Sequence, residues 1–348
     1  MRVLIATTHV PFVYGGAEAH AAALKEALQA AGHEADIAAV PFKWYPPDRI
    51  PDHMLAARLL DVTSSSGQII DRVIGLKFPA YLVRHPNKIM WVLHQFRGAY
   101  DLWGRGDSDL LDAPAGAHLR EAIRAADATA FAESQALYAN SRNVADRLKR
   151  FCGVEASPLY HPPPRAENFT AGAYEDFLLV PSRIEKLKRQ DLIVEALRLT
   201  SAPVRAVFIG PAPSSQARRA FRDMIASAGI GDRVTWLGEV SEAEKLDLYA
   251  RCLGVVFTPL DEDYGYVTLE AMLAAKAVIT CTDSGGPLEF VIDQQTGLVC
   301  APLAESLAEA MSRLWQDCKL AREYGVAGRE HYRSFDLSWR RVLSCLLG

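Results

Sequence analysis

The residues best suited to chemistry stand in the segment 260–270, Leu-Asp-Glu-Asp-Tyr-Gly-Tyr-Val-Thr-Leu-Glu. This segment follows an apolar run at 255–258 that predicts a buried strand, and it opens a helix predicted over 266–275. Glu262 would then lie in the loop, with Glu270 about one turn into the helix. Two carboxylates placed in this way could each contact a different part of one bound ligand.

Gly265 in the same segment allows the backbone to approach a ligand closely. The next residues would offer free amides at the positive end of the helix dipole, which is a suitable site for a phosphate. These amides belong to Tyr266, Val267 and Thr268. From there the Glu270 carboxylate could reach a pair of ribose hydroxyls. The alternative is a helix whose acidic N-terminal residues merely favour its dipole.

A second segment, Val180-Pro-Ser-Arg-Ile-Glu-Lys-Leu-Lys-Arg-Gln190, also follows a predicted strand and precedes a helix. Arg183 and Lys188 could neutralise two oxygens of a diphosphate from one side. The alternative is a solvated basic helix start. Cations near a helix N-terminus oppose the dipole, however, and such locally unfavourable choices tend to occur at functional sites.

A third segment, Asp283-Ser-Gly-Gly-Pro-Leu-Glu289, repeats the order of strand, glycine-rich turn and helix. Gly285 and Gly286 allow a tight turn at the carboxyl end of the strand. Glycine pairs are common in turns, so this segment alone carries little weight.

Taken in order, these segments resemble the retaining GT-B glycosyltransferases of the large family numbered four, the group-1 glycosyltransferases with an E-x7-E motif. The resemblance covers nearly the whole chain and is most specific over 179–297. The matching residues are Arg183 and Lys188, then Glu262, Gly265 and Glu270, then Gly285, Gly286 and Glu289. The chain departs from the family pattern at Arg189, where the family often has Gly, which alters the loop but removes neither phosphate ligand.

The resemblance also implies roles. Arg183 and Lys188 would hold the donor diphosphate, Glu270 the nucleotide ribose, and Glu262 the sugar being transferred. Backbone near Gly238 and Val240 would touch the base. Catalytic roles would fall to Glu262, His94, Arg183 and Lys188, and donor binding to Gly15, Gly16, Gly238, Val240, Gly265, Tyr266, Val267, Thr268 and Glu270.

The N-terminal half contributes further candidates. Gly15 and Gly16 look like the family's first glycine-rich loop, and the segment is not a dinucleotide-binding G-x-G-x-x-G. His94 follows a predicted strand and matches the family's active-site histidine, although a lone His at a strand end is often structural. The aromatic side chains at 96–103 suit a sugar face or plain packing equally. Ser141 is predicted first as a helix cap.

The elements that must position these residues alternate between strands and helices through both halves of the chain, which predicts parallel sheets covered by helices. Strands are predicted at 2–8, 34–40, 73–76, 88–93, 137–139, 177–181, 204–209, 234–237, 255–258 and 277–280. Helices are predicted at 17–31, 114–133, 142–151, 190–199, 216–228, 242–251 and 266–275, and the end of the chain, 303–348, has helical character.

The proline-rich stretch 161–176 interrupts this alternation and has the composition of a linker. We therefore expect an α/β protein of the GT-B type, with two Rossmann-like domains facing across a deep cleft. Residues 1–165 would bind the acceptor and 166–332 the nucleotide-sugar donor. The final helix, about 333–348, would pack back onto the first domain.

Composition narrows the class. The chain has 348 residues, enough for two such domains, and a formal net charge of −4 gives no general attraction to nucleic acid. Six scattered cysteines without a C-x-x-C pair suit reduced thiols in the cytoplasm. The start of the chain does not read as a signal peptide, and no apolar run is long enough to span a bilayer. Residues 77–88 could touch a membrane surface, but a buried segment is the favoured interpretation.

The resulting hypothesis is a retaining transferase that moves a sugar, such as a hexose, from a nucleoside-diphosphate sugar to an acceptor hydroxyl without a metal or other cofactor. The acceptor could be a sugar, a lipid-linked molecule or a small metabolite. A metal-dependent transferase remains an alternative because Asp261 and Asp263 form a D-x-D. A nucleotide-sugar epimerase, a phosphorylase and a non-catalytic nucleotide-sugar-binding protein are further alternatives.

Overall fold

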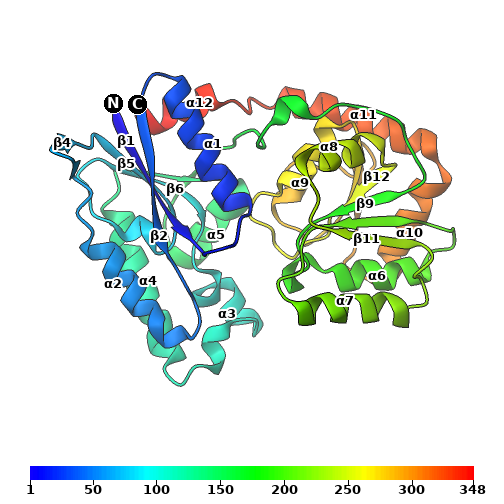
Figure 1. The fold of residues 1–348 in the computed structure, drawn as a ribbon, viewed down its shortest axis with the longest axis horizontal. Helices are drawn as coiled ribbons and strands as arrows, with labels where there is room; N and C mark the ends of the chain where they lie inside the picture. Colours follow the sequence, from blue (N-terminus) through cyan, green and yellow to red (C-terminus); the bar gives the residue numbers. More distant parts are fainter. The chain divides into compact units, whose positions relative to one another are not determined.

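The computed structural model describes all residues from Met1 to Gly348. They form two compact units, shown in Figure 1. Unit 1 comprises Met1–Pro164 together with Leu337–Gly348, and unit 2 comprises Arg165–Asp336. The chain thus leaves unit 1 once and returns to it for its last helix.

Unit 1 is built on a six-stranded parallel sheet in the order β2-β1-β5-β6-β7-β8. The strands are β1 (Arg2–His9), β2 (Glu34–Pro41), β5 (Arg72–Lys77), β6 (Lys88–His94), β7 (Ala136–Ala139) and β8 (Ser157–Pro158). A small hairpin pairs β3 (Ser64–Ser65) with β4 (Gln68–Ile69). The interior residues of the central strands are mostly apolar because helices cover both faces of the sheet.

One face of this sheet packs against three helices, α2 (Ile50–Leu59), α4 (Gly116–Ala132) and α5 (Arg142–Cys152). The other face packs against α1 (Gly16–Ala30) and α12 (Trp339–Leu347). Shorter helices are α3 (Asp101–Arg105) and the 3-10 helices η1 (Pro47–Arg49), η2 (Ala80–Leu82), η3 (Arg97–Ala99) and η4 (Asp109–Asp112).

The C-terminal helix α12 belongs to the core of unit 1, where it lies beside α1 (Figure 1). Val342 and Leu346 are fully buried. The Arg72 guanidinium donates to the Leu346 carbonyl at 2.6 Å, and the Tyr138 hydroxyl donates to the Cys345 carbonyl at 3.1 Å. Apolar burial and polar contacts therefore both fix this helix.

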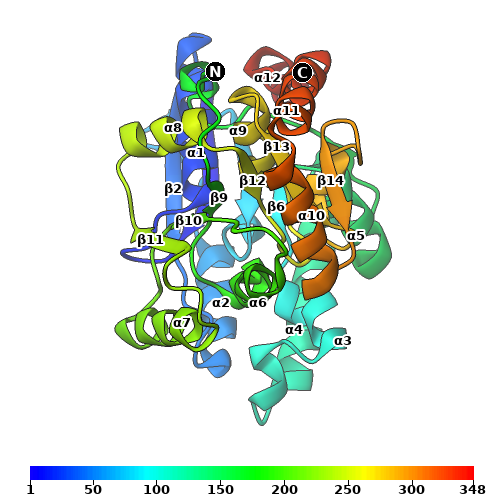
Figure 2. The ribbon, with the colours of Figure 1, turned by 90° about the vertical axis from the view of Figure 1, so that its right-hand side faces the viewer.

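Unit 2, turned toward the viewer in Figure 2, has its own six-stranded parallel sheet in the order β11-β10-β9-β12-β13-β14. The strands are β9 (Leu178–Pro181), β10 (Ala206–Ile209), β11 (Val234–Gly238), β12 (Gly254–Val256), β13 (Ala277–Cys281) and β14 (Gly297–Cys300). Counted within the unit, this is the Rossmann order 3-2-1-4-5-6, whose switch point lies between β9 and β12.

Helices of unit 2 complete its core. They are α6 (Gln190–Leu199), α7 (Ser215–Ser227), α8 (Glu242–Arg251), α9 (Tyr266–Leu273), α10 (Ala304–Gln316) and α11 (Cys318–Ser334), with the 3-10 helices η5 (Ala166–Asn168), η6 (Lys186–Lys188) and η7 (Gly286–Glu289). No helix of either unit combines the length and the apolar character that a membrane span requires.

Two predictions about elements need correction, and a third is confirmed. The turn at Gly286 leads into the single-turn η7 rather than an α-helix. The helix predicted from residue 114 begins at Gly116, where a Cβ would lie 1.8 Å from the Leu110 carbonyl oxygen. The stretch 77–88 forms η2 and buried backbone, with Phe78 and Tyr81 at most 2% exposed, so the buried interpretation is confirmed.

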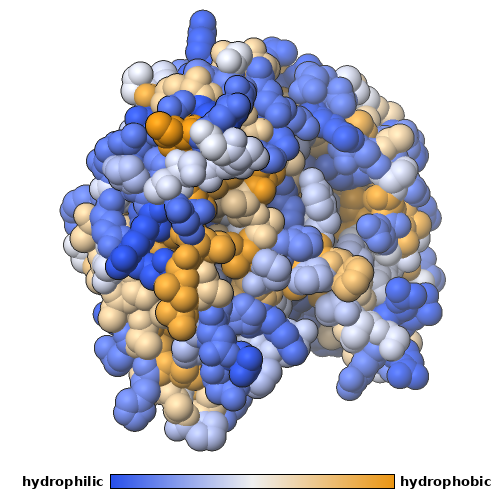
Figure 3. Space-filling view, turned by 60° about the vertical axis from the view of Figure 1, so that its left-hand side comes forward, coloured by the Kyte–Doolittle hydropathy of each residue, from blue (hydrophilic) through white to orange (hydrophobic).

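Unit 1 nevertheless exposes several large apolar side chains. Phe12 is fully exposed and has a positive φ of 66°, and Tyr14, Leu59 and Ile69 are each more than two-thirds exposed. On the face drawn in Figure 3, apolar side chains gather in patches between polar ones.

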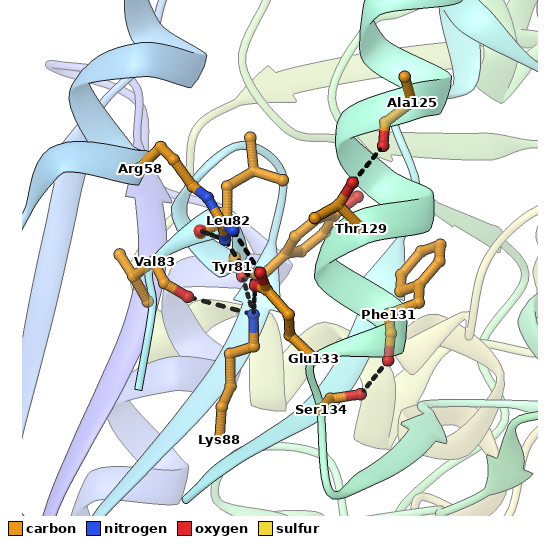
Figure 4. A network of polar contacts seen from close by, with 10 residues as sticks. All are labelled: Arg58, Tyr81, Leu82, Val83, Lys88, Ala125, Thr129, Phe131, Glu133 and Ser134. Atoms are coloured by element: carbon orange, nitrogen blue, oxygen red, sulfur yellow. Dashed lines mark hydrogen bonds and ion pairs between the residues drawn. The ribbon is translucent and has the colours of Figure 1, made fainter. Parts of the chain in front are cut away.

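A buried lysine joins several elements of unit 1 (Figure 4). Lys88, fully buried at the start of β6, donates to the Val83 and Tyr81 carbonyls at 3.1 and 3.3 Å. Its ammonium lies 3.8 Å from Glu133, which also pairs with Arg58 of α2. Burial lowers the pKa of Lys88 to about 8. Since this group lies at the amino end of β6, it serves the fold rather than the candidate site.

Candidate functional site

The candidate donor residues of unit 2 flank the switch point of its sheet. Arg183 and Lys188 follow β9, and Glu262 follows β12, the neighbouring strand across that point. In open parallel sheets, ligands bind outside the carboxyl ends of the strands at this position. Sequence reasoning placed these residues in loops after strands, and the fold brings them to one edge.

Lys188 and Glu262 contact each other directly. The Lys188 ammonium donates to the Glu262 carboxylate, and it also lies 5.6 Å from the centre of the Phe257 ring. Both charged side chains are about one-fifth exposed. Arg183 differs, because its side chain is about half exposed and pairs with Glu185 at 3.1 Å. The site thus holds one partly buried cation and one more exposed cation.

The loop of Glu262 is joined to the third glycine-rich segment. The Glu262 amide donates to the Ser284 carbonyl at 2.9 Å, and the Gly286 amide donates to the Glu262 carbonyl at 2.8 Å. A Cβ on Gly286 would lie 2.6 Å from the Tyr264 carbonyl oxygen. Only glycine permits this close approach, so the third segment shapes the loop that carries Glu262.

Helix α9 begins directly after Gly265, which has a φ of +85° that favours glycine. The expectation of three free amides needs correction, because the Thr268 amide donates to the Gly265 carbonyl at 3.0 Å. This bond closes the first turn of the helix. The candidate phosphate site is therefore the N-terminus of α9 at Tyr266 and Val267, without the Thr268 amide.

Glu270 lies one turn into α9 and is 8% exposed. Its two carboxylate oxygens accept from Lys245 at 3.0 Å and from the Tyr249 hydroxyl at 2.7 Å. Burial and the Glu270 charge raise the pKa of Tyr249, so this hydroxyl stays protonated as a donor. Burial alone would lower the pKa of Lys245, but Glu270 and Glu242 raise it overall.

Lys245 and Tyr249 were not among the sequence candidates. They stand four residues apart on α8, a spacing that puts both on one face of the helix. That pattern is visible in the sequence, but the contact of this face with α9 depends on the folded unit.

Arg189 has a larger structural role than the sequence suggested. Its φ of +52° is the left-handed conformation that glycine adopts most easily, consistent with the glycine often found there in the family. Its guanidinium donates twice to Asp283, at 2.8 Å each, and to the Thr258 and Pro259 carbonyls at 2.6 and 2.9 Å. One side chain thus ties together the loops after β9, β12 and β13.

The candidates for base contact lie at the end of β11. Gly238 has a φ of +75°, and its carbonyl accepts from the Gly210 amide at 2.6 Å. Val240 directly precedes Ser241, whose hydroxyl caps α8 by accepting from the Glu244 amide at 3.2 Å. Both therefore lie at the carboxyl edge of the sheet, like the other donor candidates.

In unit 1 the candidates also gather at carboxyl ends of strands. Gly15 and Gly16 begin α1 just after β1, and the Gly15 amide donates to the Glu18 carboxylate at 2.9 Å. His94 ends β6, with its Nδ1 at 2.8 Å from the Gln95 carbonyl. Ser141 caps α5 by accepting from the Val144 amide at 3.0 Å, as predicted.

Buried polar atoms mark this edge of unit 1 independently. The side chains of Thr8, Gln95 and Asn140, at or just beyond the ends of β1, β6 and β7, are at most 4% exposed. The Thr8 hydroxyl, both amide atoms of Gln95 and the Asn140 amide oxygen lack hydrogen-bond partners within the chain. Since unsatisfied buried groups are costly, they favour a polar ligand or ordered water at this edge.

The aromatic side chains after β6 serve packing rather than an open sugar face. Tyr100 is 3% exposed, and its hydroxyl donates to Asp127 at 2.7 Å. Phe96 lies against Phe78 with 5.5 Å between ring centres. Of the two interpretations left open, the structure thus favours packing for these residues.

The structure offers no ready-made set of metal ligands. No three His, Cys, Asp or Glu side chains in the structure group as a metal ion would require. In the D-x-D segment, the Asp261 amide donates to the Asp283 carbonyl at 2.9 Å, and the intervening Glu262 pairs with Lys188. Independence from a metal stays a prediction.

Comparison with solved structures defines the class. Sucrose-phosphate synthase from Thermosynechococcus elongatus superposes with a TM-score of 0.79 at 17% identity, covering 100% of this chain and 98% of that one. Anabaena HepE in complex with UDP and glucose gives a TM-score of 0.71 at 14% identity, with the same coverages. The protein has the GT-B fold, with two Rossmann-like domains.

The sequence profile for "Glycosyl transferases group 1" matches residues 167–331. The human alpha-1,3/1,6-mannosyltransferase ALG2 is 31% identical over 180 residues, 48% of this chain and 43% of that protein. The D-inositol 3-phosphate glycosyltransferase of Mycobacteroides abscessus is 28% identical over 233 residues, 62% and 51%. The chain spans about half the length of these two relatives.

Proposed function

We propose that this protein is a retaining glycosyltransferase that moves a sugar from a nucleoside-diphosphate sugar to an acceptor hydroxyl, without a metal. The observation that carries the proposal is the gathering of Lys188, Glu262 and the α9 N-terminus at the switch point of a Rossmann-ordered sheet. The match of residues 167–331 to the profile of group-1 glycosyl transferases supports it independently.

Each group has a chemical task in this proposal. Arg183 and Lys188 neutralise the diphosphate, and the α9 N-terminus adds its dipole. Glu270, held by Lys245 and Tyr249, accepts from the ribose hydroxyls. When the phosphate leaves, the negative charge that develops on it meets groups that are already in position, so little reorganisation is needed.

In this proposal, other residues contact the transferred sugar. Glu262 contacts it, with His94 and the glycine pair at 15–16 on the acceptor side. A double displacement needs a nucleophilic carboxylate about 5 Å from its partner, and the acceptor side offers no clear candidate. We therefore favour attack of the acceptor from the side of the leaving phosphate, which itself takes the acceptor's proton.

The substrate class follows by analogy. The relatives are named as mannosyltransferases and as inositol phosphate and maltose phosphate enzymes, and a hexose donor fits that range. For the acceptor, the exposed apolar side chains of unit 1 support a lipid-linked or otherwise amphipathic molecule, with peripheral contact to a membrane. The six cysteines, none in a disulfide, support work in the cytoplasm.

A thermal-shift screen tests the donor site. The protein is heated with UDP, GDP, ADP, CMP or dTDP, with and without EDTA. At about 100 times Kd, a true ligand should add about 2.7 kcal/mol to the unfolding free energy. We expect one diphosphate to raise the melting temperature in EDTA for the wild type but not for Glu270→Ala. No shift with any nucleotide would contradict the donor site, and a shift abolished by EDTA would favour the metal-dependent alternative.

An activity assay with the nucleotide sugar that this screen identifies tests the reaction itself. With the matching nucleotide sugar, the proposal expects a product whose new glycosidic bond keeps the configuration of the donor and which forms only when an acceptor is present. Conversion of the donor without an acceptor would favour the epimerase, and an inverted product would contradict retention.

A further inference from the structure

We propose that unit 2 carries a second anion site, at the edge of its sheet opposite the donor residues, which binds the phosphate group of a small phosphorylated molecule or lipid. The site is a pocket of about 330 Å³ beside α11. Its lining includes Gly172, Tyr174, Ala275, Arg322, Arg329 and Arg333. The inference does not depend on the proposed transferase activity.

Three arginines give the pocket its charge. Arg322, Arg329 and Arg333 stand seven and four residues apart on α11, so one face of the helix carries all three. None of them forms an ion pair or a hydrogen bond with a carboxylate, although Glu330 also lines the pocket. Three guanidinium groups on one helix face without acidic partners carry positive charge that an anion bound among them would neutralise.

The opposite wall limits what can bind. Two cations lie over the Tyr174 ring, the Lys276 ammonium at 3.7 Å and the Arg322 guanidinium at 5.0 Å from its centre. Its hydroxyl donates to the Ala275 carbonyl at 2.7 Å. The ring is therefore already engaged with cations, which makes it less suited to stacking on a nucleobase or a sugar. A pocket of this size with arginine donors suits a phosphate or pyrophosphate group, which guanidinium groups bind in a bidentate manner.

The pocket is also rigidly built. A Cβ on Gly325 of α11 would lie 2.0 Å from the Ala275 carbonyl oxygen, and one on Gly172 would lie 2.7 Å from the Ala250 carbonyl oxygen. These two close backbone contacts set the positions of both walls. The arginine face of α11 is thereby held against the segment that enters β9.

Topology separates this pocket from the donor residues. Residues 171–174 precede β9, and Ala275 precedes β13, so the pocket lies at the amino ends of these parallel strands. The donor candidates follow the carboxyl ends of β9 and β12. Helix α9 runs from one edge to the other, with Gly265 at its start and Ala275 just past its end. The two sites are therefore distinct.

The test measures binding of inorganic pyrophosphate by titration calorimetry. The background is Arg183→Ala/Lys188→Ala, which removes the candidate diphosphate ligands of the donor site. We expect pyrophosphate to bind this background protein, and Arg329→Gln/Arg333→Gln to weaken binding about a hundredfold, because each charge-assisted bond contributes strongly. The matched control is Arg218→Gln/Arg219→Gln, which removes two charges from exposed positions on α7.

Co-sedimentation with phosphatidylglycerol vesicles, compared with phosphatidylcholine vesicles, distinguishes the source of the phosphate. Vesicle binding that depends on Arg329 and Arg333, without pyrophosphate binding, assigns the site to a lipid headgroup. Pyrophosphate binding alone assigns it to a soluble ligand. The proposal is overturned if neither probe depends on these arginines, or if the α7 control weakens binding equally.

Discussion

The ion pair between Lys188 and Glu262 joins two residues to which different tasks are proposed, one toward the diphosphate and one toward the sugar. Held together, they orient each other at a partly buried position. A diphosphate arriving beside Lys188 would share that ammonium, so that Glu262 gains freedom to contact the sugar. The pair thus links donor binding to the orientation of the sugar contact.

Removal of either donor cation should lower the rate strongly. We expect Arg183→Ala and Lys188→Ala each to reduce turnover several hundredfold, about 3–4 kcal/mol, because the charge on the leaving phosphate would lose a partner. Steady-state kinetics with the matching donor measures this effect. Arg198→Ala, an exposed arginine that pairs with Glu195 on α6, is the control and should retain full rate. Near-normal turnover in both test variants would contradict the assignment.

Tyr249 should act as a positioning residue through Glu270. We expect Tyr249→Phe to weaken nucleoside diphosphate binding about tenfold, because Glu270 loses one of its two donors and with it a fixed orientation. Titration calorimetry measures the affinity. Tyr174→Phe removes a hydroxyl bonded to the Ala275 carbonyl in the same unit and should leave nucleotide affinity unchanged. Equal losses in both variants would indicate a general structural effect.

At the scale of elements, the side chain of Arg189 connects several loops of unit 2. Three strand-to-helix loops meet at its guanidinium, so their mutual positions depend on a single side chain. The backbone conformation at this position costs free energy for any residue other than glycine, and the four hydrogen bonds offset that cost.

Substitutions at Arg189 separate these two contributions. We expect Arg189→Ala to lower the free energy of unfolding by about 2–4 kcal/mol, since it loses the bonds and keeps the unfavourable φ. Arg189→Gly loses the same bonds but relieves the backbone, so it should be about 1 kcal/mol more stable than Arg189→Ala. Chemical denaturation measures both. A glycine variant less stable than the alanine variant would contradict the argument.

The sequence predicted most elements because their signals are local. Apolar runs gave the strands, and Ser141 and Gly265 marked helix starts that the structure contains. Helix α2 was missed because its apolar residues lie on both sides, with Ile50 buried and Leu59 exposed. Strand β14 was missed because four residues carry no clear period.

The candidate site was predictable only where a motif named its residues. The motif located Arg183, Lys188, Glu262 and Glu270 in loops or at helix starts, and the structure brings the first three to one sheet edge. It could not reveal the contacts that α8 makes with Glu270, because those depend on tertiary packing. Nor could it reveal that the Thr268 amide is bonded within the helix, since that bond depends on the turn that begins at Gly265.

At the scale of the whole molecule, two buried titratable groups of unit 1 oppose each other in their response to pH. Burial raises the pKa of Asp127 to about 7, and its oxygens accept from Tyr81 and Tyr100. Burial lowers the pKa of His20 to about 3, while its ring lies 2.9 Å from that of His161. Both values apply to the folded state, against 3.8 and 6.5 as the ordinary values.

The signs of the two contributions differ. Between about pH 4 and 7 the folded state holds a proton on Asp127 that the unfolded state lacks. The free energy of unfolding therefore falls as pH rises through this range. Below pH 6.5 the unfolded state protonates His20 while the folded state does not, so stability is lost as pH falls toward 3. Each contribution changes by at most about 1.4 kcal/mol per pH unit.

Comparison of variants isolates these contributions. We expect Asp127→Asn to become more stable relative to the wild type as pH rises from 4 to 7, because Asn has no proton to lose. We expect His20→Gln to become more stable relative to the wild type as pH falls from 6.5 to 4. Unfolding free energies from denaturant titrations at each pH measure both trends. A difference between wild type and Asp127→Asn that does not change with pH would contradict the buried-acid argument.

The return of the chain to unit 1 has a consequence for genetic recombination. Since unit 2 occupies one uninterrupted stretch, 165–336, inside the sequence of unit 1, exchanging it with a relative requires two junctions. A single genetic crossover near residue 165 would also replace 337–348, and foreign side chains at Val342 and Leu346 would then meet the native Leu24 and Trp91. Recombination should therefore favour double crossovers that keep the first and last segments of this gene together.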